Sequence, residues 1–280
     1  MSGGGVRIAC LQMNSGNDFA RNLSTFSAAA REAAATGAQF ILSPEYFLMM
    51  DGSGRVMRDA ALDERGEPAL SEICALAHEL GVFLLAGSLT VRSTEGQMCN
   101  RSILIGSDGN VVAAYDKIHM FDVTLPDGKV IRESSGYRPG ERAVLAQTPW
   151  GALGMTVCYD LRFPALFRAL AQAGAVLVTV PSSFQRQTGK AHWHALLRAR
   201  AIENECFVIA PAMCGDHPGN RQSYGHSMVV DPWGEIIAEG GESPEIIYAE
   251  IDPSRAAKVR AMIPSLEHDR PFSPPDGRMS

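Results

Sequence analysis

The sequence has no segment suited to a membrane anchor or an export signal. None of its apolar runs, over 280 residues, approaches the length that spans a bilayer. The first five residues provide neither the basic region nor the apolar region of a secretory signal peptide. Six cysteines in such a chain are expected to be reduced thiols and not a disulfide framework. The sequence therefore predicts a cytoplasmic protein without a membrane partner.

An excess of basic charge is also missing. The chain has 25 Lys and Arg against 31 Asp and Glu, a formal net charge of −6, which does not provide the basic face that binds nucleic acid. A Walker glycine pattern that would hold phosphates is absent as well. With 46% hydrophobic and 20% charged residues, the composition is that of an ordinary globular protein. We expect neither a nucleic-acid partner nor a cofactor.

Strand and helix patterns alternate along the whole chain. The expected strands cover residues 6–13, 39–42, 82–89, 152–157, 176–180 and 207–212. The expected helices cover residues 22–35, 68–80, 164–173 and 191–206. Two hairpins are expected, at 102–115 and around 231–235. This alternation predicts an α/β fold with helices layered on sheet.

No Gly/Ser linker or charge run divides the sequence, so we expect one domain over residues 1–280. Its core is expected over about 5–263. The prolines at 271, 274 and 275 predict an extended tail over 264–280.

Cys158 stands where a strand pattern gives way to a helix pattern. An apolar run ends at this cysteine, a polar turn follows, and Pro164 opens an alanine- and leucine-rich stretch. A strand end would fix the sulfur in place, and nearby amides with the helix dipole are expected to favour its thiolate. This order is typical of a nucleophile.

Glu45 and Lys117 follow two other strand patterns. Strand ends of an α/β fold meet on one rim, so the carboxylate, the ammonium and the thiol are expected to converge. The carboxylate can take the thiol proton, and the ammonium can stabilise an oxyanion. Such a trio suits acyl transfer from an amide or nitrile through a thioester, which water then hydrolyses.

The residues around this trio resemble the nitrilase superfamily of carbon–nitrogen hydrolases. The matching motifs are Pro44-Glu45, residues 115–119 and residues 158–164, in the family's order and spacing. The resemblance implies an α-β-β-α sandwich and a homodimer or larger homo-oligomer. It also implies hydrolysis of linear amides, not peptide bonds, without a cofactor or metal. Glu133 occupies the motif of a second glutamate, which orients Lys117 and helps to hold the substrate.

Within the superfamily, the sequence most resembles the deaminated-glutathione amidase group and its ω-amidase relatives. The supporting segments are residues 121–128, 132–134, 191–203 and 223–234. The resemblance implies a small 2-oxo acid amide as substrate, with release of ammonia or an amine. Deaminated glutathione is the first candidate. Alternatives are 2-oxoglutaramate or 2-oxosuccinamate, and another amidase or carbamoylase activity of the superfamily.

The same resemblance assigns the substrate contacts. Arg162 matches an arginine that meets a carboxylate in related ω-amidases, and bidentate pairing suits a 2-oxo acid. Phe184 and Thr188 belong to a loop that lines the pocket in relatives. The backbone N–H of Tyr159 would join Lys117 as the oxyanion hole. Between the two loop positions, residues 185–187 are larger than expected, which leaves open how the distal end of the substrate is held.

Three rival interpretations are less well supported. A cysteine–histidine hydrolase would need one of four histidines as base, and none lies in a cysteine-protease signature: His119, His192, His194 and His226. A metal site would draw on a Cys/His group that lacks the spacing of zinc modules: Cys206, Cys214, His217 and His226. A binding protein without turnover would have no reason to keep all three members of the trio.

Overall fold

Two sheets packed face to face form the centre of the computed structural model, which describes residues 5–126 and 128–273. The first sheet has the spatial order β16 (Glu245–Ile251), β1 (Val6–Gln12), β2 (Phe40–Leu42), β3 (Phe83–Arg92), β4 (Met98–Ile105) and β5 (Val111–Asp116). The second has the order β15 (Ile236–Glu239), β14 (Met228–Val230), β11 (Phe207–Ala210), β10 (Leu177–Thr179), β9 (Gly151–Met155) and β8 (Val144–Thr148).

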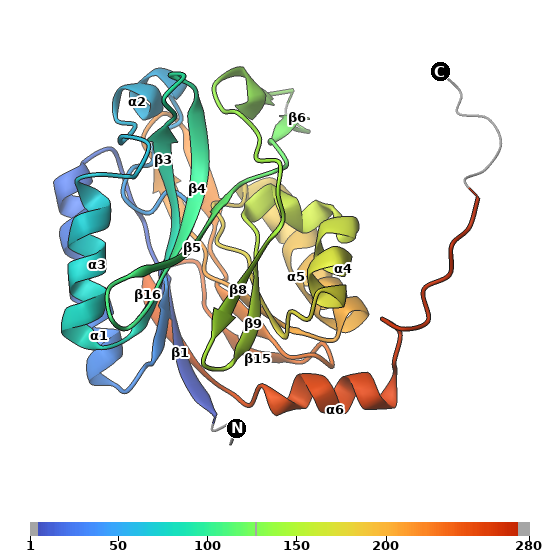
Figure 1. Ribbon diagram of the computed structural model, residues 1–280. Coiled ribbons are helices and arrows are strands. Elements are labelled where there is room, and N and C mark those ends of the chain that lie inside the picture. The colour runs from blue at the N-terminus through green and yellow to red at the C-terminus, as the bar shows by residue number, and fades with distance from the viewer. Residues whose placement is uncertain (1–4, 127, 274–280) are drawn as a thin grey trace.

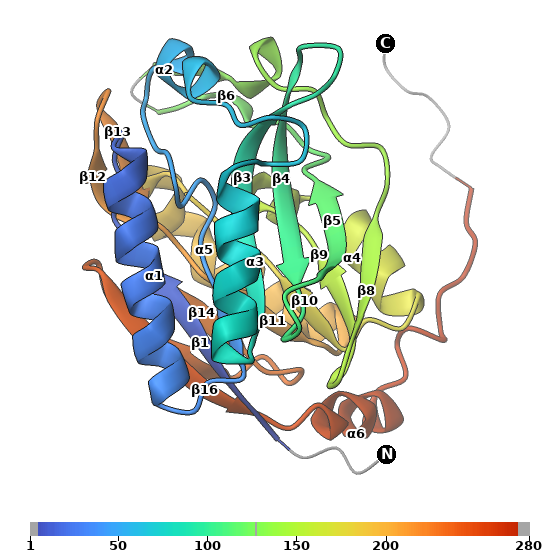
Figure 2. The same ribbon diagram turned by 60° about the vertical axis from the view of Figure 1, so that its left-hand side comes forward.

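Helices cover the outer faces of both sheets. Figure 2 shows α1 (Phe19–Ala35) and α3 (Ala69–Leu80) side by side over the first sheet. On the opposite side, α4 (Pro164–Gln172) and α5 (Arg186–Asn204) cover the second sheet (Figure 1). The remaining elements are α2 (Gly54–Asp59), α6 (Ser254–Met262), the hairpins β6 (Asp122–Thr124) with β7 (Val130–Arg132) and β12 (Cys214–His217) with β13 (Arg221–Tyr224), and the 3₁₀ turns η1 (Glu133–Ser135) and η2 (Cys158–Arg162).

The strand β1 shows how the sequence builds these layers. Ile8 and Cys10 pack between the two sheets, while Ala9 and Leu11 pack on the other face, towards the helices α1 and α3. Successive side chains of a strand point to opposite faces, so a strand buried on both sides needs an unbroken apolar run. The run over residues 8–11 meets that need, which makes this strand a central one.

The structure confirms the α/β prediction and most of the expected elements. The expected hairpins appear as antiparallel pairs, β4 with β5 and β14 with β15. The predicted start of the last long helix was wrong, because α5 begins at Arg186 and not at 191. Gly189, a usual sign of a loop, lies inside this helix. A Cβ atom there would come within 2.5 Å of the Tyr224 side chain, so close packing selects the glycine.

The C-terminal residues run along the surface after α6. Arg168 on α4 donates to the backbone carbonyl of Ser265 and to the Asp269 carboxylate, which attaches this segment to the second helix layer. Figure 1 shows the described residues after this attachment, up to 273, leading away from the body of the molecule. The last part of the expected tail, 274–280, lies outside the described residues. Among the described helices, none combines the length and apolarity needed to cross a membrane.

Candidate active site

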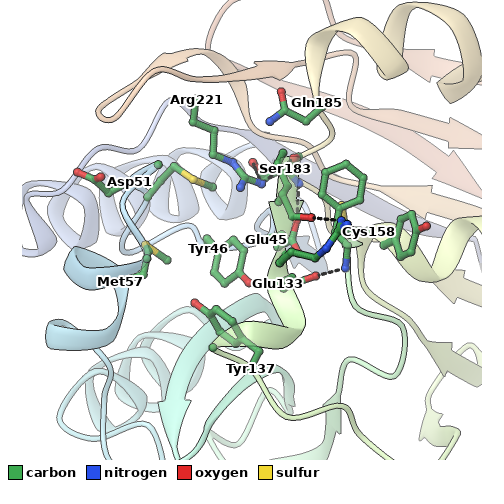
Figure 3. A pocket seen from close by; sticks show the side chains of 18 of the residues that line it. Glu45, Tyr46, Asp51, Met57, Glu133, Tyr137, Cys158, Ser183, Gln185 and Arg221 are labelled. Carbon is green, nitrogen blue, oxygen red and sulfur yellow. Dashed lines mark hydrogen bonds between the residues drawn. The ribbon is translucent and has the colours of Figure 1, made fainter. Parts of the chain in front are cut away.

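Three strand ends, from both sheets, meet at the base of one cavity. Glu45 lies three residues beyond β2, Lys117 directly follows β5, and Cys158 lies three residues beyond β9. All three line a cavity of about 310 Å³, a volume within the range of small-molecule sites. Figure 3 shows Glu45 and Cys158 next to each other, with Glu133 beside them. The side chains that the sequence analysis singled out for chemistry are therefore close together.

Lys117 is held by two carboxylates. Its ammonium nitrogen lies 3.0 Å from Oε1 of Glu45 and 2.9 Å from both carboxylate oxygens of Glu133. Lys117 and Glu45 are only 2% and 1% exposed. Burial alone would lower the pKa of Lys117, but the charges of Glu133 and Glu45 outweigh it and raise that pKa. The lysine is therefore a fixed cation inside the cavity.

Glu45 also accepts hydrogen bonds from two neutral donors. The Asn100 amide donates to Oε1 at 2.9 Å, and the backbone N–H of Ser183 donates to Oε2 at 2.8 Å. Burial would raise the pKa of Glu45, but the charges of Lys117 and Arg221, with the hydrogen bonds from Cys158 and Lys117, lower it below its ordinary value. The carboxylate is hydrogen-bonded to the Cys158 thiol as well. The resting pair is thus an ionised acid beside a thiol.

The expectation of a resting thiolate is wrong in this structure. Burial first, and then the negative charge of Glu45, raise the pKa of Cys158 above its ordinary value, although Lys117 opposes them. The helix α4 starts only at Pro164, and Cys158 is the first residue of the 3₁₀ turn η2 that precedes it. The helix dipole falls off within one turn, so it does not reach Cys158.

Cys158 has a strained backbone. Its φ of +49° lies in the left-handed region, which is uncommon for residues other than glycine. A hydrogen bond of 3.0 Å from its backbone N–H to the carbonyl of Pro181 holds this conformation. Such strain persists only where the surroundings impose it, and it concentrates at functional sites.

Glu133 is fixed by donors from two other segments. The Tyr46 hydroxyl donates to Oε1 at 3.0 Å, and the backbone N–H of Phe121 donates to Oε2 at 2.6 Å. Tyr46 has a φ of +60° and is a further strained residue at the cavity wall. These contacts orient the carboxylate that in turn orients Lys117.

A family model described as carbon–nitrogen hydrolase matches residues 7–261. The chain belongs to the carbon–nitrogen hydrolase family. This confirms the resemblance found in the sequence and the prediction of an enzyme that acts on carbon–nitrogen bonds.

Relatives of this hydrolase carry one recurring name. The "Deaminated glutathione amidase" of Yersinia enterocolitica is 39% identical over 95% of this chain and 93% of its own length. The human protein of the same name is 41% identical over 94% of this chain and 82% of its own.

Solved structures of the superfamily share the fold. The Saccharomyces cerevisiae protein Nit3, described as a member of branch 10 of the nitrilase superfamily, has a TM-score of 0.84 and 31% identity, covering 93% of this chain and 94% of that one. The C. elegans NitFhit protein has a TM-score of 0.90 and 37% identity, covering 96% of this chain and 66% of that one. The hydrolase thus has the sandwich fold expected from the sequence.

The predicted substrate contacts divide into two groups. Tyr159, Phe184 and Thr188 line the cavity of this hydrolase. Arg162 is not among the residues that line it. Its guanidinium lies 5.2 Å from the centre of the Phe184 ring and 3.2 Å from Nδ1 of His192, on the side of α5. In this structure Arg162 packs against Phe184, which lines the cavity, and the contact of Arg162 with a substrate carboxylate stays a prediction.

The cavity has polar residues that the sequence analysis did not find. Arg221 comes from the hairpin β12–β13, and Asp51 from the loop before α2 (Figure 3). Tyr137 lies beside Tyr46, with 6.0 Å between ring centres. These residues come from short or irregular segments without apolar periodicity. The one available signal was the position of Arg221, two residues before the 223–234 segment.

The four histidines named as rival bases do not line the cavity: His119, His192, His194 and His226. His119 Nδ1 lies 2.7 Å from the Asp160 carboxylate, and its ring stacks on Phe163 at 3.5 Å. It does not line the cavity. His194 and His226 share the carboxylate of Glu239, at 2.7 and 2.9 Å, and the three could present ligand atoms within 4.8 Å of one another.

Proposed function

We propose that this hydrolase is an amidase that cleaves deaminated glutathione and carries the acyl group as a thioester on Cys158. The observation that carries this proposal is the contact of Lys117 with Glu45 at 3.0 Å beside the Cys158 thiol in one cavity. The names of the relatives support the substrate. In deaminated glutathione, a 2-oxo acid is joined through an amide to cysteinylglycine.

Acylation would start from the resting thiol. Glu45 takes the proton of Cys158 as the sulfur bonds to the amide carbon, so the negative charge moves onto the carbonyl oxygen. When the tetrahedral centre collapses, the C–N bond breaks and Glu45 returns the proton to the leaving nitrogen. The amine cysteinylglycine departs and the thioester stays. The lowered pKa of Glu45 fits a base that is ionised before substrate arrives.

Deacylation would use the same carboxylate. Glu45 takes a proton from water as the water oxygen attacks the thioester carbon, and the proton then passes to the leaving sulfur. The products are the free carboxylic acid and the Cys158 thiol. One base therefore serves both halves of the reaction. Because Glu45 passes the water proton to the sulfur, the Cys158 thiol and the Glu45 carboxylate are both restored at the end.

The oxyanion would bind the Lys117 ammonium and the backbone N–H of Tyr159. The amides on either side are already engaged: Cys158 N–H donates to the Pro181 carbonyl, and Asp160 N–H to the Val157 carbonyl. Tyr159 also lines the cavity. A cation and an amide placed before the reaction stabilise developing charge without reorganisation.

A substrate panel tests the activity. It contains deaminated glutathione, 2-oxoglutaramate, an N-carbamoyl amino acid and a simple nitrile, and it measures released amine or ammonia together with the acid. Deaminated glutathione should give the highest kcat/KM. Best activity on 2-oxoglutaramate would replace this substrate with the ω-amidase one, and best activity on the nitrile or carbamoyl compound would refute the amidase proposal.

Two variants test the thioester. Cys158→Ala should lose turnover and keep the fold, because a small thiol contributes little packing. Cys74→Ala, a half-buried cysteine on α3, is the matched control and should keep full activity. Intact-protein mass spectrometry of the wild type during turnover should show the added acyl group. Turnover in Cys158→Ala would contradict the mechanism.

We also propose a homodimer or larger homo-oligomer. Ile202, Trp233 and Ile263 are 49%, 48% and 51% exposed and border one groove beside α5 and α6. Apolar patches of this kind are typical of subunit contacts. Light scattering should give a mass of at least two chains, and Ile202→Glu should lower it. A monomer at assay concentration would contradict this proposal.

We also propose that the protein is a single domain and that it is located in the cytoplasm. Residues 1–280 would form one carbon–nitrogen hydrolase domain, with a core over about 5–263 and an extended C-terminal tail over 264–280. The contacts of Arg168 with Ser265 and Asp269 support attachment of the first part of this tail, up to 269. All six cysteines are free thiols, which suits the reducing cytoplasm. Fractionation of cells should recover the protein in the cytoplasm.

A further inference from the structure

Arg221 is a cation that lines the cavity, where its charge acts on the Glu45 carboxylate. It is half-buried, and its Nε atom is buried without a hydrogen bond within the described residues. Across that part of the chain, the Arg221 side chain forms no ion pair. Its two contacts are long: Nη2 lies 3.3 Å from the carbonyl oxygen of Ser183 and 3.5 Å from its hydroxyl. A guanidinium removed from water is costly unless an anion pairs with it.

Two acidic residues of the cavity wall and the hairpin, Asp51 and Asp216, are engaged with other groups. Asp51 accepts hydrogen bonds from Asn17 at 2.8 Å and from the backbone N–H of Ser53 at 2.7 Å. Asp216 pairs with Arg186 at 3.0 Å. Neither carboxylate pairs with Arg221, so the Arg221 guanidinium can pair with an anionic group that enters the cavity.

The position of Arg221 is fixed before any ligand binds. At the hairpin tip, the backbone N–H of Gly52 donates to the Pro218 carbonyl at 2.9 Å. A Cβ atom on Gly52 would come within 2.1 Å of the Gly219 carbonyl oxygen, so the loop and the hairpin touch backbone to backbone. Figure 3 shows the Arg221 side chain extending from the hairpin towards Ser183.

Hydrogen bonds also hold Ser183, the residue that Arg221 contacts. The hydroxyls of Ser183 and Ser223 lie 2.8 Å apart, and His217 Nε2 lies 2.9 Å from the Ser223 hydroxyl. The backbone N–H of Ser183 meanwhile binds Glu45. Ser183 thus contacts both Arg221 and the proposed base Glu45, and hydrogen bonds fix this part of the cavity wall before a ligand binds.

We infer that Arg221 binds the carboxylate of the acyl part of the substrate. This inference rests on the proposed amidase function. The leaving amine must depart while the acyl part remains as a thioester, so the acyl part belongs at the enclosed wall and the leaving part at the open rim. Arg221 is the half-buried arginine of the lining, whereas Arg58 and Arg132 are exposed. A planar guanidinium with a free edge suits a carboxylate.

A pair of matched substrates tests the inference. N-glutarylcysteinylglycine and N-pentanoylcysteinylglycine share the scissile amide and the leaving group, and they differ by one terminal carboxylate. The ratio of their kcat/KM values should fall about 10- to 100-fold in Arg221→Gln, the range for a lost charge-assisted contact. Arg221→Lys keeps the charge but not the planar fork, so its ratio should lie between those of the wild type and Arg221→Gln. Arg186→Gln, on the neighbouring helix and outside the lining, should leave the ratio unchanged.

A binding measurement separates this inference from the proposed function, because it needs no turnover. Calorimetry with glutarate should show about 10- to 100-fold weaker binding to Arg221→Gln than to the wild type. If the wild type cleaves neither deaminated glutathione nor the glutaryl amide, the proposed function fails while the glutarate result still decides the role of Arg221. Equal loss on both substrates, or unchanged glutarate binding, would overturn the inference and leave Arg221 acting through Glu45.

Discussion

The ammonium nitrogen of Lys117 lies 2.9 Å from both carboxylate oxygens of Glu133. Glu45, by contrast, offers this ammonium a single oxygen and keeps its second oxygen for the backbone N–H of Ser183. Glu133 therefore holds the lysine, and Glu45 remains available to the Cys158 thiol. The two glutamates differ in role because their hydrogen bonds differ.

Glu133→Gln is expected to lower kcat about 10²- to 10³-fold, the effect of a misplaced oxyanion donor. The variant keeps the size of the side chain and removes the charge that orients Lys117. Steady-state kinetics with deaminated glutathione measures the loss. Tyr46→Phe, which deletes one 3.0 Å hydrogen bond to Glu133, is the control and should cost only a few-fold. A Glu133→Gln enzyme within about threefold of wild type would contradict this role.

Glu45→Gln and His119→Ala separate the two possible bases. Glu45→Gln should abolish acylation, since no group is left to take the thiol proton. His119→Ala should keep acylation, because its ring contacts Asp160 and Phe163 and does not line the cavity. Rapid mixing followed by mass spectrometry of the acyl-enzyme measures the step directly. Loss of the acyl-enzyme in His119→Ala alone would assign the base to histidine.

The convergence of Glu45, Lys117 and Cys158 could be predicted because each follows a strand with an apolar pattern. A buried strand fixes the position of the residue after it, so local sequence already carries part of the geometry. The protonation of Cys158 could not be predicted in this way. It depends on burial of the sulfur and on the opposing charges of Glu45 and Lys117, two residues distant in sequence.

Arg221 shows a different limit of sequence reasoning. The strands β12 and β13 have four residues each and are largely polar, so no apolar alternation reveals them. Their place at the cavity depends on backbone contact between Gly52 and Gly219, which only the folded chain creates. The motif favours Arg162 because this arginine follows the cysteine, but Arg162 lies 5.2 Å from the centre of the Phe184 ring and is not among the residues that line the cavity.

Removal of metal ions is expected to leave kcat/KM unchanged. Lys117 already supplies the positive charge that a metal would bring to the oxyanion. Among the described residues, the group that could bind an ion consists of His194, His226 and Glu239, and it does not line the cavity. Dialysis against a chelator, with metal content measured before and after, provides the check. Activity lost on chelation and restored by Zn²⁺ would contradict the proposed chemistry.

His217 should make the fold sensitive to mild acid. Its Nδ1 lies 2.8 Å from the Ser15 carbonyl oxygen, so this nitrogen carries the proton, and Nε2 accepts from the Ser223 hydroxyl. Burial lowers the pKa of His217 to about 4 from 6.5. Between about pH 4 and pH 6.5, His217 is protonated in the unfolded chain and neutral in the folded chain. Stability is therefore fully present above pH 6.5 and falls as the pH drops to about 4, by about 3 kcal/mol from this residue.

Denaturant unfolding of the wild type and of His217→Gln at pH 7, 6 and 5 measures this contribution. Glutamine can donate to Ser15 and accept from Ser223, but it does not titrate. The free-energy gap between the two proteins should narrow or reverse towards pH 5, since the wild type alone loses the His217 contribution there. Carboxylates titrate in both proteins and cancel in the difference. A gap that stays constant from pH 7 to pH 5 would mean that His217 binds its proton equally in the folded and unfolded chain.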